Sequence, residues 1–217
     1  MRQAQSIIAF LGGTFDPIHF GHLRLATEVQ QALDAQVMLL PNQTPPHKAQ
    51  QQVSFAHRCN MVELAIAAHP ELTLSTLEAQ LPQPNYSVQT LQHLRQHQPQ
   101  AAIVFVIGMD SLLNIQSWHR WQELLAYCHL LVCRRPGCNT DYPAPLAQFL
   151  AQHESTDIEP LLRTRNGRIF FLESTELEIS SSHIRQQIIQ GQSPRYLLPD
   201  NVIEYIKQNK LYLNLEA

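Results

Sequence analysis

The segment Phe10–Leu23 constrains the fold of this chain more than any other part of the sequence. It reads F-L-G-G-T-F-D-P-I-H-F-G-H-L, an apolar strand that runs into a double-glycine turn and then into two histidines. Gly12 and Gly13 remove side chains where backbone must approach a ligand closely. Amides at the start of a following helix can hold anionic oxygens. The segment therefore predicts a strand, a turn and a helix that together cradle a phosphate group.

Two histidines in this segment strengthen the phosphate hypothesis. His19 and His22 are three residues apart across Gly21, so both imidazoles can direct donors at the same charge. An ordinary turn with two solvent-facing histidines is the plain alternative. A second alternative makes both residues metal ligands, but two imidazoles alone make a poor zinc site. We therefore expect a phosphate site here and no protein-bound metal.

The rest of the chain alternates apolar strands with amphipathic helices, which indicates an α/β domain with a mostly parallel sheet. Ala101–Ile107 is a continuous apolar run and is predicted to be the central strand. The other predicted strands are Ser6–Leu11, Val37–Leu40, Leu72–Leu77, His129–Cys133 and Arg168–Leu172. Helices are predicted after His22 to about Asp34, over Ser54–Ala68, from a Ser87 cap to about Gln96, over Trp118–Tyr127 and Ala147–His153, from Ser180 or Ser181 to Gln190, and over Pro199–Asn209. Asn42–Gln52 and Arg134–Pro145 are predicted loops.

Length and composition bound the class of protein. With 217 residues, 44% of them hydrophobic, the chain predicts a single domain, residues 1–217, of which 174–217 form a helical C-terminal part. A net charge of −3 argues against a nucleic-acid-binding surface. The apolar run Ile7–Leu11 is too short for a signal peptide or membrane span. The four cysteines show no C-x-x-C pair or zinc spacing, which favours reduced thiols in a cytoplasmic protein.

A second motif, I-S-S-S-H-I-R, covers Ile179–Arg185 after the last predicted strand. Its hydroxyl groups can cap a helix. Arg185 lies about one turn from Ser181 and Ser182, so its guanidinium and the helix-start amides can face one anion. The alternative is an ordinary serine-capped helix with a surface arginine. The first motif makes the anion site the preferred interpretation.

A third motif, G-M-D, covers Gly108–Asp110 directly after the central strand. Open parallel sheets bind ligands beyond the carboxyl ends of their strands. An aspartate there can accept hydrogen bonds from ribose hydroxyls, although a plain helix-capping aspartate is an equal alternative for this motif alone. Because the first and third motifs both follow strands, we expect them at the same edge of the sheet.

Together these motifs resemble the nucleotidyltransferase superfamily with the H-x-G-H signature, and more closely the bacterial nicotinate-nucleotide adenylyltransferase family. The resemblance also includes P-P-H-K at Pro45–Lys48, Y-S-V-Q-T-L at Tyr86–Leu91, Trp118 downstream of G-M-D-S-L-L, and C-R-R-P-G at Cys133–Gly137. It covers nearly the whole chain in order. It implies a Rossmann-like nucleotidyltransferase fold, with helices on both faces of the sheet and a small C-terminal helical extension.

The resemblance further implies transfer of AMP from ATP to nicotinate mononucleotide, giving deamido-NAD and pyrophosphate in NAD biosynthesis, with Mg²⁺ accompanying ATP. The implied catalytic residues are His19, His22 and Arg185. The implied ATP-binding residues are Gly12, Gly13, Thr14, Phe15, Gly108, Asp110, Arg134, Ile179, Ser180 and Ser181. The implied acceptor-binding residues are Asn42, His47, Lys48, Tyr86, Ser87, Thr90 and Trp118.

Other functions stay open at this point. Another superfamily member would use nicotinamide mononucleotide or pantetheine phosphate as acceptor, or CTP as donor. A nucleotide-binding regulator without turnover is an alternative from a different class, although intact His19, His22 and Arg185 argue against it. We expect no nucleic-acid or membrane partner. The oligomeric state, monomer or homodimer, does not follow from the sequence.

Overall fold

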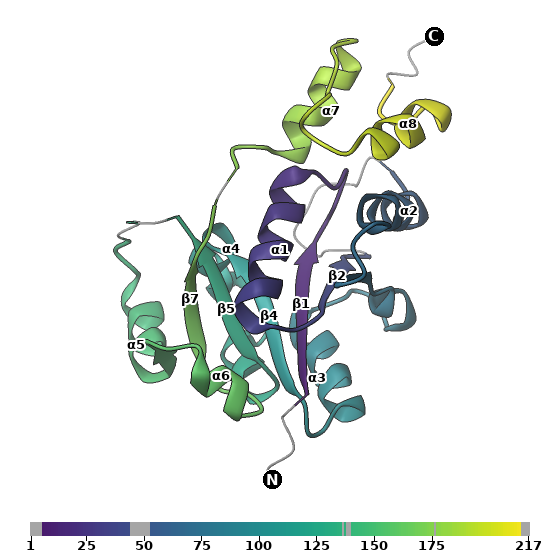
Figure 1. Cartoon of the computed structure of the whole chain (residues 1–217). Helices are drawn as coiled ribbons and strands as arrows, with labels where there is room; N and C mark the ends of the chain where they lie inside the picture. The colour runs from purple at the N-terminus through teal and green to yellow at the C-terminus, as the bar shows by residue number, and fades with distance from the viewer. Residues whose placement is uncertain (1–5, 44–52, 136, 138–139, 176, 214–217) are drawn as a thin grey trace.

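The computed structural model describes residues 6–43, 53–135, 137, 140–175 and 177–213. Over these residues, seven parallel strands form one sheet in the order β3-β2-β1-β4-β5-β7-β6 (Figure 1). The strands are β1 (Ile7–Gly13), β2 (Val37–Pro41), β3 (Leu72–Leu74), β4 (Ala102–Gly108), β5 (His129–Arg134), β6 (Glu154–Ser155) and β7 (Ile169–Glu173). The α-helices are α1 (Phe20–Leu33), α2 (Phe55–Ile66), α3 (Ser87–His97), α4 (Met109–Leu113), α5 (Ala144–His153), α6 (Glu159–Arg163), α7 (Ser181–Ile189) and α8 (Asp200–Gln208). Three 3-10 helices are η1 (Leu77–Gln80), η2 (Ile115–Ser117) and η3 (Trp121–Ala126).

Strand β4 lies at the centre of the sheet, as the apolar run predicts. It pairs with β1 on one side, where Phe10 lies opposite Phe105, and with β5 on the other. Successive side chains of a strand point to opposite faces, so Val104 and Val106 enter one core while Ile103 and Phe105 enter the other. A strand buried on both faces needs apolar residues at every position, and this explains the unbroken run.

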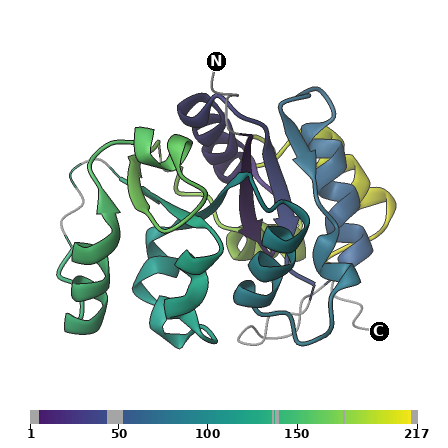
Figure 2. The ribbon, with the colours of Figure 1, turned by 90° about the horizontal axis from the view of Figure 1, so that it is seen from below.

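Helices cover both faces of the sheet, and Figure 2 shows them on either side of it. One core holds side chains of α1, α2, α7 and α8 against the sheet, and the other holds side chains of α3, α4, η3 and α5. The C-terminal helices α7 and α8 lie above the carboxyl end of β1 in Figure 1. Residues of α8 therefore share a core with β1. Helices α7 and α8 lie at the edge of the sheet where the sequence motifs are found. No helix among the described residues has the length and apolar character needed to cross a membrane.

Three predicted helix ends agree with the structure. Ser54 accepts a hydrogen bond from the His57 amide at 3.3 Å and begins α2. Ser180 accepts one from the His183 amide at 3.2 Å and begins α7. Gly191 follows α7 with a φ of +71°, the left-handed conformation that favours glycine.

Other boundaries were wrong, and each has a local cause. The predicted strand from Leu72 stops at Leu74, which pairs with Leu39; β2 continues to Pro41, but proline has no amide hydrogen to extend the ladder. The predicted helix over Trp118–Tyr127 is only the 3-10 helix η3. Arg120 has a φ of +53°, which no right-handed helix can include.

Two further differences concern the start of α3 and the shortest elements. Tyr86, not Ser87, is the capping residue of α3, and Ser87 is the first residue inside that helix. The sequence patterns also missed the short elements α4, β6 and α6. Their lengths of five, two and five residues hold too few positions for a periodic pattern.

Candidate active site

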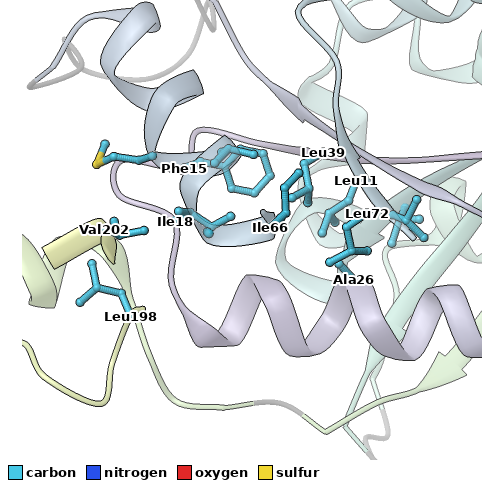
Figure 3. Close-up of a cluster of buried hydrophobic side chains, with 14 of the residues drawn as sticks. Leu11, Phe15, Ile18, Ala26, Leu39, Ile66, Leu72, Leu198 and Val202 are labelled. Carbon is cyan, nitrogen blue, oxygen red and sulfur yellow. The ribbon is translucent and has the colours of Figure 1, made fainter. Parts of the chain in front are cut away.

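The turn between β1 and α1 is held in place by the packing of its own apolar side chains. Phe15 and Ile18 point away from the site and belong to the buried cluster that also holds Leu198 and Val202 (Figure 3). The Phe15 ring lies over Gly13, where an added Cβ would approach it to 2.8 Å. Packing of the turn therefore requires glycine at this position.

The two histidines stand together at the first turn of α1. Their rings stack with centroids 3.7 Å apart. The His19 amide donates to Nδ1 of His22 at 3.3 Å, so the proton of a neutral His22 ring lies on Nε2. Burial lowers the pKa of His19 to about 4, so this ring is neutral at pH 7. Before a ligand arrives, His19 therefore offers a hydrogen-bond donor and no positive charge.

Helix α7 brings the second motif onto the same turn. The Arg185 guanidinium donates from Nη1 to the carbonyl of Asp16 at 2.7 Å. The Ser181 hydroxyl donates to the carbonyl of Pro17 at 2.9 Å. Residues almost 170 positions apart thus meet within one turn, and Arg185 adds the positive charge that the neutral His19 lacks.

Beside this turn is a cavity of about 460 Å³ at the carboxyl ends of β1 and β4. Eight residues expected at the site line it: Gly12, Gly13, Asn42, Tyr86, Ser87, Gly108, Asp110 and Trp118. Polar and aromatic residues with no role assigned from the sequence complete the wall, namely Glu78, Asn85, Phe105, Ser111, Asn114, Ser117 and His119, together with Ile107. The first and third motifs therefore meet at one edge of the sheet, as their positions after strands predict, and α7 brings the second motif onto the turn beside them.

The donors and rings of this cavity come from different elements. Tyr86 precedes α3, and its carbonyl accepts from the amides of Gln89 and Thr90 at 2.9 and 3.2 Å. The earlier amides of a helix have no partner within it, so this end of α3 faces the cavity with donors. The Tyr86 ring lies 4.5 Å from the His119 ring. The Trp118 ring, which also lines the cavity, lies 6.3 Å from the Phe105 ring.

Six expected site residues lie at the turn beside this cavity and do not line it, namely Thr14, Phe15, His19, His22, Ser181 and Arg185. Four others lie neither at the turn nor in the wall of the cavity. Thr90 is buried behind it and donates to the Glu78 carboxylate at 3.3 Å. Arg134 lies at the end of β5 with its guanidinium over the Phe171 ring, 5.0 Å from the centroid. Ile179 and Ser180 instead line a second, more open hollow together with Arg135 and His183. His47 and Lys48 fall outside the described residues.

Sequence reasoning gave no role to two buried charges beside the cavity, Arg58 and Glu78. Arg58 occupies the inward face of α2 in register with Met61, Val62 and Ala65, at the spacing i, i+3, i+4 and i+7. A charged residue in an otherwise apolar stripe is the signal that could have found it. Glu78 lies in η1, where no periodic pattern was available. Burial raises the pKa of Glu78, and hydrogen bonds from Gln43 and Thr90 and the charge of Arg58 oppose that rise.

Comparison with known proteins shows the family of this chain. A family model described as cytidylyltransferase-like matches residues 10–187. The probable nicotinate-nucleotide adenylyltransferase of Aeromonas hydrophila is 47% identical over 206 residues, which cover 94% of this chain and 96% of that protein. The protein of the same name from Acidithiobacillus ferrooxidans is 46% identical over 207 residues, covering 94% and 95%.

Solved structures show the same fold. Plasmodium falciparum nicotinic acid mononucleotide adenylyltransferase complexed with NaAD superposes with a TM-score of 0.73 at 20% identity, covering 98% of this chain and 100% of that one. A putative nicotinate-nucleotide adenylyltransferase from Vibrio parahaemolyticus gives 0.64 at 18% identity, covering 97% of each chain. At these identities the likeness concerns the fold alone. The close relatives decide the family: this chain belongs to the nicotinate-nucleotide adenylyltransferases, within the cytidylyltransferase-like family.

Proposed function

We propose that this protein transfers AMP from ATP to nicotinate mononucleotide, forming deamido-NAD and pyrophosphate. The observation that carries the proposal is the meeting of His19, His22 and Arg185 at one turn, beside a cavity large enough for a nucleotide. Close relatives named for this activity, aligned over nearly the whole chain, support the same choice. The structural neighbour from Plasmodium falciparum is described in complex with NaAD, the dinucleotide product of such a reaction.

The chemistry needs positioning more than proton transfer. A phosphate monoester is largely dianionic at pH 7, because its second pKa is about 6, so the attacking group needs no general base. Two anions that repel each other must be aligned, and charge on the leaving pyrophosphate must be neutralised. We assign His19 and His22 as donors to the phosphates and Arg185 as their positive partner. The amides of Thr14 and Phe15 complete this proposed phosphate site.

The nicotinate ring is assigned to the wall formed by the start of α3. Its carboxylate would accept from the amides near Tyr86 and Ser87, at the positive end of the helix dipole. Trp118 would stack on the pyridine ring. Asn42 lies on the same cavity wall. This geometry favours an acid over an amide, because an amide brings no negative charge to the helix end.

Adenosine is assigned to the far side of the turn. Gly108 and Asp110 line the cavity at the end of β4, where the carboxylate can accept from ribose hydroxyls. An added Cβ at Gly108 would lie 2.8 Å from the Asp110 carboxylate, so glycine keeps this side chain in place. Ile179 and Ser180 line the second, more open hollow, and their backbone can receive the adenine base.

We propose that Mg²⁺ enters with ATP and not on a cage of protein ligands. Among the described residues, no three His, Cys, Asp or Glu side chains are grouped to hold a metal ion. Magnesium usually keeps several waters and binds phosphate oxygens with one or two carboxylates. Bound in this way, magnesium would offset charge on the phosphates.

The direct test is a product assay. Purified protein is mixed with ATP, Mg²⁺ and nicotinate mononucleotide, and the products are separated by chromatography while pyrophosphate release is followed. We expect equal amounts of deamido-NAD and pyrophosphate. Parallel reactions with nicotinamide mononucleotide, pantetheine phosphate and CTP distinguish the other superfamily members. Product from pantetheine phosphate alone, or no pyrophosphate with any acceptor, would remove the proposal.

A further inference from the structure

The fully buried guanidinium of Arg58 is the unusual feature of helix α2. A buried charge is costly unless its hydrogen bonds are satisfied inside the protein. Nη1 of Arg58 donates to the carbonyl of Thr14 at 2.7 Å, in the turn that follows β1. Nη2 makes a longer contact of 3.5 Å with the carbonyl of Gln43, which follows β2. The Arg58 side chain thus contacts both the turn between β1 and α1, here called the phosphate turn, and the segment that follows β2.

The carboxylate of Glu78 holds the other side of the same segment. Its Oε2 accepts from the Gln43 amide at 3.0 Å. Its Oε1 accepts from the Thr90 hydroxyl at 3.3 Å, within the first turn of α3. The Asn85 side chain donates to the Glu78 carbonyl at 3.1 Å. Glu78 therefore ties Gln43 to the helix end that faces the acceptor.

Both polar groups of the Gln43 backbone are held by these two opposite charges. The chain of contacts runs from Thr14 through Arg58 to Gln43, and from Gln43 through Glu78 to Thr90. Glu78 lines the cavity wall, and the chain of contacts joins the segments after β1 and β2 to the first turn of α3. A backbone bond from the Asn42 amide to the Gly13 carbonyl, 2.9 Å, runs parallel to it.

We propose that Arg58 and Glu78 are positioning residues that fix the spacing between the phosphate turn and the acceptor pocket. The proposal rests on the adenylyl transfer assigned above. That reaction requires the acceptor phosphate to lie in line with the α-phosphate of ATP. ATP can bind at the phosphate turn, and the acceptor in its pocket, without the contacts of Arg58 and Glu78. The two reacting atoms meet only if the distance between the turn and the pocket is fixed. A displacement of about 1 Å at a reacting centre can cost on the order of 100-fold in rate.

The proposal predicts a specific kinetic pattern. Glu78→Ala and Arg58→Met lower kcat by about 10-fold or more, whereas the dissociation constants of the separate substrates change by less than about threefold. Glu78→Gln restores most of the lost rate, because a neutral amide of the same shape can still accept from the Gln43 amide. Arg58→Lys gives an intermediate rate, since an ammonium lacks the fork that reaches two carbonyls.

The experiment measures kcat by pyrophosphate release and each dissociation constant by calorimetry. ATP is represented by an analogue with a methylene bridge between its α- and β-phosphorus atoms, which cannot react, and nicotinate mononucleotide is titrated alone. Arg163→Met, a change of the same type at an exposed arginine of α6, is the matched control and keeps the wild-type rate. Thermal melting reports whether each variant folds. If Arg58→Met does not fold, the Glu78 pair and Arg58→Lys decide the question.

Three results would overturn the proposal. An unchanged kcat in folded Glu78→Ala removes the positioning role. Increased KM values and dissociation constants with an unchanged kcat would instead assign these residues to substrate binding or to structure alone. Equal loss in Glu78→Gln and Glu78→Ala assigns the effect to charge and not to the held backbone. A wild-type protein that forms no deamido-NAD contradicts the proposed function instead. The wild-type assay therefore tests the proposed function, and the variants test the positioning role.

Discussion

The hydrogen bond between Tyr212 and Asp16 gives a measurable test of how the chain end supports the phosphate turn. The Tyr212 hydroxyl donates to Oδ1 of Asp16 at 2.6 Å across 196 residues of sequence. Both side chains are buried, 7% and 4% exposed, so water cannot replace the bond. Burial and the Asp16 carboxylate raise the pKa of Tyr212 well above its ordinary value, so the phenol keeps its proton and remains the donor.

Tyr212→Phe removes one oxygen atom and keeps the packing of the ring. A hydrogen bond to a charged group contributes about 1.5–3 kcal/mol, so the free energy of unfolding should fall by about that amount. In a chain of this size each kcal/mol shifts Tm by about 2–4 °C, which predicts a loss of about 3–12 °C. Urea unfolding followed by circular dichroism measures the free energy, and a thermal melt measures Tm.

The control is Tyr196→Phe, the same atomic change at a tyrosine that is 83% exposed. It should leave both quantities unchanged. The pH dependence adds a second readout. Because the folded pKa of Tyr212 is raised, its contribution is complete below the unfolded value of about 10 and is lost as pH rises further. Tyr212→Phe should therefore flatten the alkaline decline. Equal urea midpoints for the wild type and both variants would refute the assigned bond.

The remaining predictions concern chemistry, specificity and acid stability. His22→Ala should lower kcat by about 100-fold or more with little change in KM, because its donor acts on charge that develops in the transition state; an unchanged kcat in steady-state assays would contradict that role. The acid nucleotide should exceed the amide in kcat/KM by about 10-fold or more, and equal values would contradict the α3 helix-end site for the carboxylate. Buried His129 accepts from the Arg168 amide at 3.2 Å and lies 2.9 Å from the Thr164 carbonyl, so it is held neutral, and burial lowers its pKa. Urea midpoints should fall as pH drops below about 6.5, and the slope should be smaller in His129→Gln; parallel slopes would refute this assignment.

Much of the candidate site could be predicted because its parts are local. The double glycine, His19 and His22 lie within one strand, turn and helix, so their spacing alone brings the two rings together. The motif at Gly108 and Asp110 follows the central strand, and parallel strands place their carboxyl ends at one edge. The roles that the family resemblance implies for these residues remain proposals, and mutation tests each one.

Other expectations depended on contacts that no local pattern records. Thr90 was expected in the acceptor pocket, yet its hydroxyl is bonded to Glu78 behind the wall. Arg134 was expected near the phosphates, and it packs on Phe171 at the sheet end. In both residues the backbone position was foreseeable, whereas the direction of the side chain depends on neighbours that arrive from distant segments.

The sequence by itself determined the alternation of the longer strands and helices, the central place of β4 and the edge at which the motifs meet. These follow from hydrophobic periodicity and from the geometry of parallel strands, which act over a few residues at a time. Only the tertiary structure decided that Arg58 joins Thr14 to Gln43 and that Tyr212 holds Asp16. Such buried polar contacts form because a desolvated charge must find partners, and folding selects those partners from segments far apart in the chain.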